Sequence, residues 1–259
     1  MNGVQIYEFP KAKGIVVSGD IHGDFTKLVY KVCIQYNMTD TLIVVAGDCG
    51  FGFERYGFYE NIYNRCRERL AKANNWFVFV RGNHDNPAYF DGEKVNYKRW
   101  KAIPDYSLIK ACGHTILCVG GAKSVDRTYR MTSKYFHLKP KELLSPNVYW
   151  YNERPVYDEE RLDEIDKICA IDTVITHTAP SFCELSSHHG IQDWLIHDED
   201  LYDDLKKERK AMDDLHAYIY AHNHPLQYWF YGHFHESWHS EIEGVKYSML
   251  DCMELRELR

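Results

Sequence analysis

The stretch Ile-Val-Val-Ser-Gly-Asp-Ile-His-Gly at residues 15–23 decides the fold, because an apolar run leads straight into two side chains that can bind a metal. A short run such as Ile15–Val17, bounded by glycine, is typical of a buried strand. Asp20 and His22 follow it two residues apart, so they lie on one side of the chain if the backbone stays extended. We therefore expect both side chains to face one site.

Four further segments repeat this pattern of an apolar run followed by polar donors. They are Gly-Asp-Cys-Gly at 47–50, Gly-Asn-His-Asp at 82–85, Thr-His-Thr-Ala-Pro at 176–180 and Gly-His-Phe-His at 232–235. The runs before them are Leu42–Val45, Trp76–Val80, Val174–Ile175 and Tyr228–Tyr231. Open α/β sheets place ligand sites at the carboxyl ends of their strands. One shared site is the simplest interpretation.

Length and composition limit the class of protein. A chain of 259 residues with 45% hydrophobic and 27% charged residues is typical of an ordinary globular protein with one sizeable core. A net charge of −7 argues against an extended nucleic-acid surface, although it leaves room for a local basic pocket. Met1–Pro10 has no secretory pattern and no apolar run approaches a membrane span, so we expect a cytoplasmic protein with no membrane partner. The eight cysteines show no paired spacing and are expected to be reduced thiols.

Helical and strand patterns alternate in the first half of the chain. Apolar spacing predicts helices at Asp24–Tyr36 and Tyr59–Ala73, which gives two β-α-β units. Further helices are expected at Asp158–Ala170 and Asp198–Tyr220. Hairpins are expected at residues 106–119 and 237–252, the second turning at Glu243-Gly244. Since no linker or repeat divides the chain, we expect a single domain over residues 1–259.

The donors in these segments are oxygens and imidazoles, a mixture that suits manganese, iron or zinc. Seven residues qualify: Asp20, His22, Asp48, Asn83, His177, His233 and His235. That number is too large for one tetrahedral ion. It suits two divalent ions that share a carboxylate, the arrangement that clamps a phosphoryl group at a metal separation of about 3.5–4 Å.

The ordered blocks D-x-H, G-D, G-N-H-D, H and G-H-x-H, from Gly19 to His235, resemble those of the calcineurin-like metallophosphoesterases. The resemblance implies an α/β four-layer α/β/β/α sandwich with two mixed sheets and a dinuclear metal site at the strand ends. It implies hydrolysis of a phosphomonoester or phosphodiester by in-line attack of a bridging hydroxide, with His84 giving a proton to the leaving oxygen or binding a phosphate oxygen. It also implies two ligand sets, one of Asp20, His22, Asp48 and His235 and the other of Asp48, Asn83, His177 and His233.

One part of the phosphoprotein phosphatase pattern is missing. That branch continues its second block as G-D-x-x-D-R, where the aspartate orients the catalytic histidine and the arginine holds phosphate, but Phe51 and Gly52 stand here. Asp85, next to His84, is a candidate to orient the imidazole, although neighbouring side chains commonly diverge.

Another cation should then hold the phosphate. The segment 120–130, Gly-Gly-Ala-Lys-Ser-Val-Asp-Arg-Thr-Tyr-Arg, resembles a G-G-A-x-S-x-D-R-x-x-R segment of bacterial and phage-type members. Guanidinium groups grip two phosphate oxygens at once. We expect Arg127 or Arg130 to bind substrate, with Lys123 as a further candidate. The alternative is a salt bridge to Asp126 or another carboxylate.

Several other side chains have simpler interpretations. Solvated histidines are expected at His188, His189, His222 and His224. The aromatic group Tyr149, Trp150 and Tyr151 is expected to pack in the core, with a wall for a substrate ring as the alternative. The charged run Asp203–Asp214 is expected to be a solvated helix face, or else part of a lid.

The substrate remains open at this level. A phosphoester on a small molecule, a nucleotide or a phosphoprotein fits the blocks. A nucleotide or diadenosine-polyphosphate hydrolase is an alternative, and a nuclease is disfavoured by the charge and by the lack of a basic or aromatic stripe. A catalytically silent metal-binding interaction module is the alternative of a different class.

Overall fold

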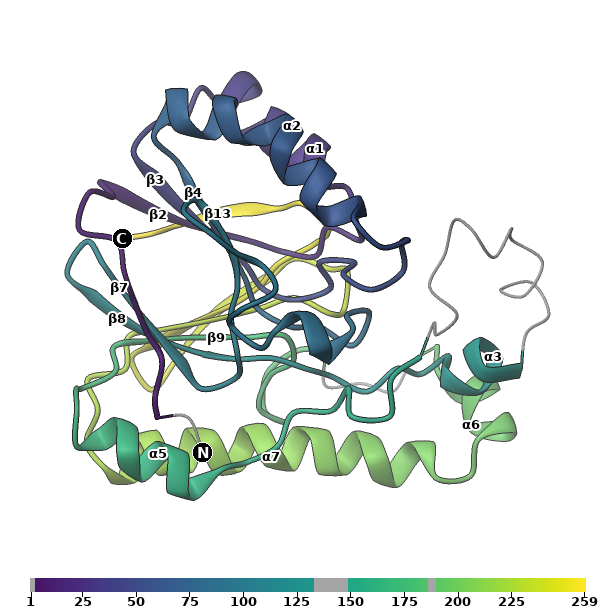
Figure 1. Cartoon of the computed structure of the whole chain (residues 1–259). Helices are drawn as coiled ribbons and strands as arrows, with labels where there is room; N and C mark the ends of the chain where they lie inside the picture. Colours follow the sequence, from purple (N-terminus) through teal and green to yellow (C-terminus); the bar gives the residue numbers. More distant parts are fainter. Residues whose placement is uncertain (1–2, 133–148, 186–189) are drawn as a thin grey trace.

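The computed structural model of the chain describes residues 3–132, 149–185 and 190–259 (Figure 1). Two β-sheets face each other in the middle of the molecule and helices cover both outer faces. The seven-stranded sheet has the order β1 (Ile6–Glu8), β7 (Ser107–Ala111), β8 (His114–Val119), β9 (Thr173–Thr176), β10 (Tyr228–Tyr231), β12 (Val245–Met249) and β11 (Trp238–Ile242). The six-stranded sheet has the order β13 (Leu255–Leu258), β2 (Gly14–Ser18), β3 (Thr41–Val45), β4 (Trp76–Phe79), β6 (Trp100–Ala102) and β5 (Asn96–Tyr97).

Both sheets are mixed, with parallel strands at their centres. In the six-stranded sheet β2, β3, β4 and β6 run parallel, and the antiparallel β13 and β5 close its edges. In the seven-stranded sheet β8, β9, β10 and β12 run parallel, while β7 and β11 are antiparallel to their inner neighbours. The parallel strands of each sheet therefore deliver their carboxyl ends to a common edge.

Alternation along the buried strands creates the layers. On β3, Leu42 and Val44 join the core between the two sheets, whereas Ile43 and Val45 pack under the helices. Successive side chains of a strand point to opposite faces, so a run that is apolar at every position needs cover on both sides. Helices α1 and α2 cover one sheet and α5 and α7 cover the other (Figure 1). The expected four-layer α/β/β/α sandwich is confirmed.

Each long helix presents an apolar stripe to its sheet. In α2 the buried residues Tyr59, Ile62, Cys66 and Leu70 recur at helical spacing, and the helix ends at Asn74 in the left-handed conformation. The bounds of the helices are α1 (Phe25–Tyr30), α2 (Phe58–Ala73), α3 (Arg127–Thr132), α5 (Glu159–Asp166), α6 (Gln192–His197) and α7 (Leu201–Ala221), with a π-helical turn η1 (Lys31–Gln35) and a 3₁₀ turn η2 (Pro87–Tyr89).

The structure differs from the sequence expectations in a few elements. The helix expected at 24–36 is α1 followed by the π-helical turn η1, and the helix expected at 158–170 ends at Asp166. The edge strands β1, β5 and β13 were not predicted, and neither was β6, which lies next to the edge. Within the described residues, no helix is both long enough and apolar enough to cross a membrane.

Candidate metal centre and active site

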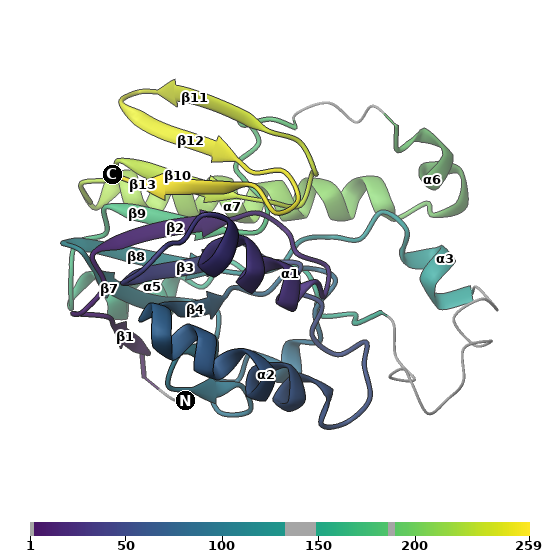
Figure 2. The same ribbon diagram turned by 90° about the horizontal axis from the view of Figure 1, so that it is seen from above.

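Five strand ends, three from one sheet and two from the other, supply the candidate ligands. Asp20, Asp48 and Asn83 follow β2, β3 and β4, and the three histidines at 177, 233 and 235 follow β9 and β10. Figure 2 shows β4, β10 and β12 pointing toward the end of the molecule where α3 and α6 lie. The ligand segments therefore meet at one end of the sandwich, at the junction of the two sheets.

The first group of donors contains Asp20, His22, Asp48 and His235. One donor atom from each residue lies within 4.8 Å of the others. The Nε2 atoms of His22 and His235 are 2.9 Å apart, and Nε2 of His235 is 3.1 Å from Oδ2 of Asp20. Bonds of about 2.0–2.1 Å from two imidazoles to one ion accommodate such a separation.

The second group contains Asp48, His177 and His233, and its donor atoms also lie within 4.8 Å of one another. Nε2 of His177 is 3.1 Å from Oδ1 of Asp48 and 2.9 Å from Oδ1 of Asn83. Nδ1 of His177 donates to the carbonyl of Ala46 at 2.8 Å, which leaves Nε2 free to bind a cation. The structure thus brings six of the seven expected ligands into two groups that share Asp48, and the seventh, Asn83, contacts His177 of the second group.

The electrostatics of these groups favour bound cations. Asp20 and Asp48 are almost completely buried, and burying a carboxylate is costly without a compensating charge. Oδ2 of Asp20 has no hydrogen-bond donor among the residues that the structure describes. Burial alone would lower the pKa of His177, but the carboxylates of Asp48 and Asp20 outweigh it and raise the pKa to about 9. An oxygen and imidazole set with an unsatisfied buried carboxylate oxygen fits divalent ions.

The backbone at the ligands is not extended, contrary to the expectation for the Asp20–His22 and His233–His235 pairs. His22, Asp48, His233 and His235 have φ angles of 44°, 42°, 74° and 53°. Residues other than glycine seldom adopt this left-handed backbone conformation, and those that do are often found at functional sites. The paired side chains converge because the chain turns at each ligand.

Glycines beside the site make room for the ligands themselves. A Cβ at Gly82 would lie 2.1 Å from Oδ1 of Asp48, and one at Gly47, whose φ is +95°, would lie 2.1 Å from Nδ1 of His177. Both contacts are far inside van der Waals distance. Any side chain at Gly47 or Gly82 would displace a candidate ligand.

His84 lies at the mouth of the centre. Its backbone amide donates to Oδ1 of Asp48 at 2.7 Å, and its ring meets that of His22 edge-on and stacks on Phe53. Burial lowers its pKa below the ordinary value, and although Asp48 opposes this, the charge of Arg130 acts in the same direction as burial. A cavity of about 300 Å³ opens beside it, lined by His22, Gly23, Asp24, Gly50, Phe53, Glu54, Phe58 and His84.

A cavity of about 630 Å³ lies between α7 and the β11–β12 hairpin, where Phe182, His216 and Tyr247 are among the lining residues. None of the candidate ligands lines it. The smaller cavity beside His84 is lined by one of them, His22.

Asp85 does not orient His84. Its carboxylate is fully buried and accepts hydrogen bonds from the backbone amides of Gly82, Cys49, Gly50 and Phe51 at 2.8–3.0 Å. Burial and the nearby Asp48 raise its pKa to about 6, and the amide donors oppose that rise. Asp85 instead clamps the loop after β3 against the loop after β4.

Phe51 occupies the core, at the position where the phosphoprotein phosphatases carry the dyad aspartate. Its ring packs against those of Phe25, Tyr59 and Phe79. In the described residues, no carboxylate is hydrogen-bonded to the imidazole of His84. The side chain instead rests between the rings of Phe53 and His22.

The three basic side chains expected to bind substrate have different surroundings. Arg127 forms ion pairs with Asp198, which precedes α7, and with Asp204, which lies in its first turn. Nζ of Lys123 lies 3.2 Å from Oε1 of Glu153 and donates to the hydroxyl of Tyr149. Arg127 and Lys123 are therefore both paired with carboxylates of the protein itself. The alternative expectation, an ion pair with Asp126, applies to Arg130, whose Nη1 lies 3.8 Å from Oδ1 of Asp126.

Arg130 contacts residues that lie beside the centre. Its Nη1 donates to Oγ of Ser124 at 2.7 Å, and its guanidinium carbon is 5.9 Å from the centre of the Phe53 ring. Ser124 in turn accepts from Nδ2 of Asn83 at 3.0 Å. Arg130 is thus linked through Ser124 to Asn83, a candidate metal ligand. Arg130 and His84 also both contact the ring of Phe53.

Ser124 and Glu153 were missed by the sequence reasoning. Oγ of Ser124 donates to Oε2 of the buried Glu153 at 2.6 Å. Since Asn83 donates its amide nitrogen to Ser124, its oxygen Oδ1 is turned toward His177. Ser124 lies inside the glycine-rich segment already noticed, whereas nothing near Glu153 in the sequence indicated a role.

The remaining candidates are mostly structural. The side chain of His224 is 2% exposed and its Nδ1 accepts from the amide of Ile171, so the expectation of a solvated histidine is wrong there. His222 stacks on Tyr218, while His188 and His189 lie outside the described residues. Trp150 is buried against Phe53, whereas Tyr151 is exposed. The charged run 203–214 is a face of α7, although Glu208 within it is buried.

Comparison with known proteins gives a family for the chain. A family model for calcineurin-like phosphoesterases matches residues 14–237. A search of curated protein sequences gave no match. Among solved structures, the chain is similar to phosphopantetheinyl hydrolase (PptH) from Mycobacterium tuberculosis, with 12% identity, 99% of this chain and 97% of that chain covered, and a TM-score of 0.45. It is also similar to GAP50, the anchor in the inner membrane complex of Plasmodium, with 15% identity, coverages of 92% and 70%, and a TM-score of 0.40. Likenesses this distant carry no information about substrate.

Proposed function

The chain belongs to the calcineurin-like phosphoesterase family, and from its site we propose that it hydrolyses a phosphomonoester or phosphodiester with the help of two divalent metal ions. The observation that carries this proposal is the meeting of two donor groups at the shared, buried carboxylate of Asp48. Manganese, iron and zinc all suit donors of this kind.

Each cation would have its own set of side chains. Asp20, His22, Asp48 and His235 would hold one, and Asp48, Asn83, His177 and His233 the other. When bound, the two ions lower the pKa of water so that a nucleophile exists near neutral pH, and they offset the negative charge of the phosphate group.

The protein's own groups would act on the substrate. His84 borders the cavity of about 300 Å³ and its ring meets that of His22, so it would give a proton to the leaving oxygen or bind a phosphate oxygen. Arg130 would grip a phosphate oxygen, since its charge reaches His84 and its guanidinium shares Phe53 with that histidine. The cavity suits the alcohol of a small-molecule phosphoester better than it suits a polymer.

We further propose that residues 1–259 form a single catalytic domain. The support is that neither sheet carries a complete ligand set: Asp48 comes from the six-stranded sheet, while His177 and His233 come from the seven-stranded one. Either sheet alone would leave both cations without part of their donors.

Turnover of a generic substrate tests the proposal. Purified protein supplied with Mn²⁺ should release nitrophenol from p-nitrophenyl phosphate or from its bis-ester. His84→Asn should reduce kcat by about 10²- to 10⁴-fold, which is the usual contribution of a positioned acid or base. The metal content of the variant, measured by elemental analysis, should match that of the wild type because His84 is not a proposed ligand.

Two results would contradict this function. One is a protein that binds two metals and turns over no member of a panel of monoesters, diesters, cyclic nucleotides and phosphopeptides, which would favour a silent interaction module. The other is a His84→Asn variant with unchanged kcat.

A further inference from the structure

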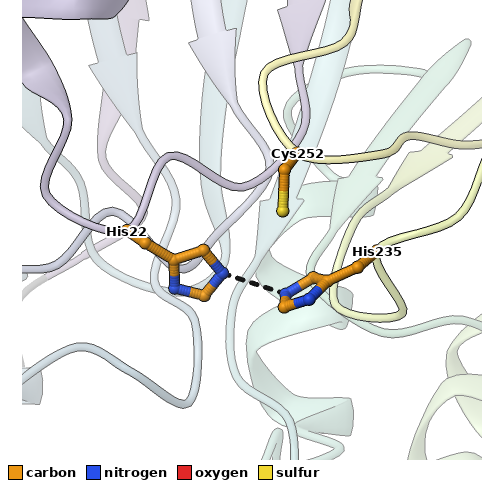
Figure 3. A group of neighbouring side chains, drawn as sticks. All are labelled: His22, His235 and Cys252. Carbon is orange, nitrogen blue, oxygen red and sulfur yellow. Dashed lines mark hydrogen bonds between the residues drawn. The ribbon is translucent and has the colours of Figure 1, made fainter.

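A cysteine that belongs to none of the family blocks lies at the edge of the candidate metal centre. Sγ of Cys252 and one ring nitrogen from each of His22 and His235 lie within 4.8 Å of one another. Figure 3 shows the thiol directed toward the line that joins the two imidazoles. Cys252 is exposed and comes from the turn between β12 and β13, so it approaches the histidines from a segment that supplies no other ligand.

The turn that carries Cys252 is fastened to the first ligand segment. The amide of Met253 donates to the carbonyl of Asp20 at 2.9 Å, and the amide of Gly19 donates to the carbonyl of Glu254 at 3.0 Å. The side chain of Met253 is buried in the core under α1 and α2. These contacts hold the residues on the carboxyl side of Cys252 against Gly19 and Asp20, which places the thiol beside the centre.

A second observation indicates a cation at this place. Oδ2 of the buried Asp20 lacks a hydrogen-bond donor in the described part of the chain, although Nε2 of His235 and of His22 lie 3.1 and 3.8 Å away. A carboxylate oxygen and two imidazole nitrogens therefore already converge before the thiol is counted. Carboxylate, imidazole and thiolate together are a common donor set for zinc.

We propose that Cys252 is an additional protein ligand for the cation held by Asp20, His22 and His235, and that its thiolate makes this position selective for thiophilic ions such as Zn²⁺ or Co²⁺. The inference rests on the proposed two-metal function. Bonds of about 2.3 Å to sulfur and 2.1 Å to nitrogen span roughly 4.4 Å across one ion, so an exposed side chain needs only a small adjustment to reach it. Thiolates select zinc over manganese or magnesium.

The second thiol near the centre does not compete for this role. Cys49 follows Asp48 directly, but it is fully buried and its Sγ donates to the carbonyl of Val80. Cys112 is exposed like Cys252 but lies in the turn between β7 and β8, where its Sγ donates to the carbonyl of Ala12. Cys112 therefore provides a matched control.

Cobalt reports directly on sulfur ligation, because a thiolate bound to Co²⁺ absorbs in the near ultraviolet by charge transfer. Titration of the metal-free full chain with Co²⁺ should produce this absorption band. Cys252→Ser and Cys252→Ala should lose the band while binding the same number of cobalt ions, and Cys112→Ser should keep it. In competition titrations, Cys252→Ser should lower the affinity for Zn²⁺ relative to Mn²⁺ by about tenfold or more.

The outcomes separate this inference from the proposed function. If the wild type binds two cobalt ions without the charge-transfer band, or if Cys252→Ser retains the band, Cys252 is not a ligand and the two-metal function survives. If the wild type binds no cobalt, manganese or zinc, both ideas fail. Equal affinity of Cys252→Ser and wild type for Zn²⁺ would also overturn the inference.

Discussion

Arg130 and Arg127 lie one turn apart on the same short helix and have different surroundings. Arg127 is held by the carboxylates of Asp198 and Asp204, whose hydrogen bonds and charges raise its pKa further. Arg130 donates to Ser124 and its charge acts on His84. Three N–H groups of Arg127 already bind two carboxylates that hold it away from phosphate, so we favour Arg130 as the phosphate-binding residue.

We expect Arg130→Ala to reduce kcat/KM for a nitrophenyl ester by roughly 10²-fold, the usual cost of losing a preorganised group that stabilises the transition state. Metal content should not change. Arg127→Ala, the matched control on the same helix, should instead lower the urea midpoint of unfolding, because it leaves two carboxylates without their cation. Steady-state kinetics together with urea titration distinguish the two roles. Equal kinetic losses in both variants would contradict the assignment.

At the level of single residues, the candidate metal ligands were predictable from the sequence, but the choice of the phosphate-binding arginine was not. Asp48 or His177 could be found because each directly follows a buried apolar run, so the neighbouring sequence alone places it at a strand end. The choice between Arg127 and Arg130 depends on Asp198 and Asp204, about 70 residues away. Cys252 was likewise visible only once its turn was seen against Asp20.

The two loops that follow β3 and β4 form one unit through Asp85. Its carboxylate accepts four backbone amides, three from residues 49–51 and one from Gly82. These loops also carry Asp48 and His84, which are joined by a hydrogen bond of 2.7 Å. The clamp therefore sets the spacing between a shared ligand and the proposed acid.

Asp85→Asn should destabilise the fold by about 3 kcal/mol, because one carboxylate oxygen becomes an amide nitrogen facing buried N–H groups. Urea unfolding measures this, and activity should fall as the loops separate. Asp91→Asn is the control: its Oδ1 alone accepts the amides of Glu93 and Lys94, a role that an asparagine oxygen fills equally well. Similar stability of the two variants would show that Asp85 does not clamp the loops.

Among the elements, the buried central strands were predictable, whereas the edge strands β1, β5 and β13 were not. Thr41–Val45 is apolar at nearly every position because helices and the opposite sheet cover both its faces. Leu255–Leu258 forms β13, which pairs with β2 at the sheet edge. Its apolar and polar residues do not alternate, and its two leucines are three residues apart, as in a helix. Its partner in the sheet, not its own pattern, makes it a strand.

For the molecule as a whole, the centre joins the two sheets. Bound cations would connect Asp20, Asp48 and Asn83 of one sheet to His177, His233 and His235 of the other. Anything that binds the folded state and not the unfolded state raises the free energy of unfolding. The metals should therefore stabilise the sandwich as well as support catalysis.

Removal of the metals with EDTA should lower Tm, and Zn²⁺ or Mn²⁺ should restore it. At a free concentration 100 times its Kd, each site adds about 2.7 kcal/mol. Scanning calorimetry at several metal concentrations measures the effect. In Asp48→Asn, which lacks the shared charge, most of the metal-dependent increase should disappear. A Tm that does not respond to metal in the wild type would contradict this coupling of the sheets.

The pairing of His22 with His235 has a consequence for how the protein is made. The Nε2 atoms of the two rings are 2.9 Å apart in space, but the residues are 213 positions apart along the chain. A growing chain emerges from the ribosome in sequence order, so the donors around Asp20 and His22 wait in an incomplete state until the second half has been synthesised. Neither ligand set can close before its last histidine, His233 or His235, has left the exit tunnel, and we expect metal to enter only after that point.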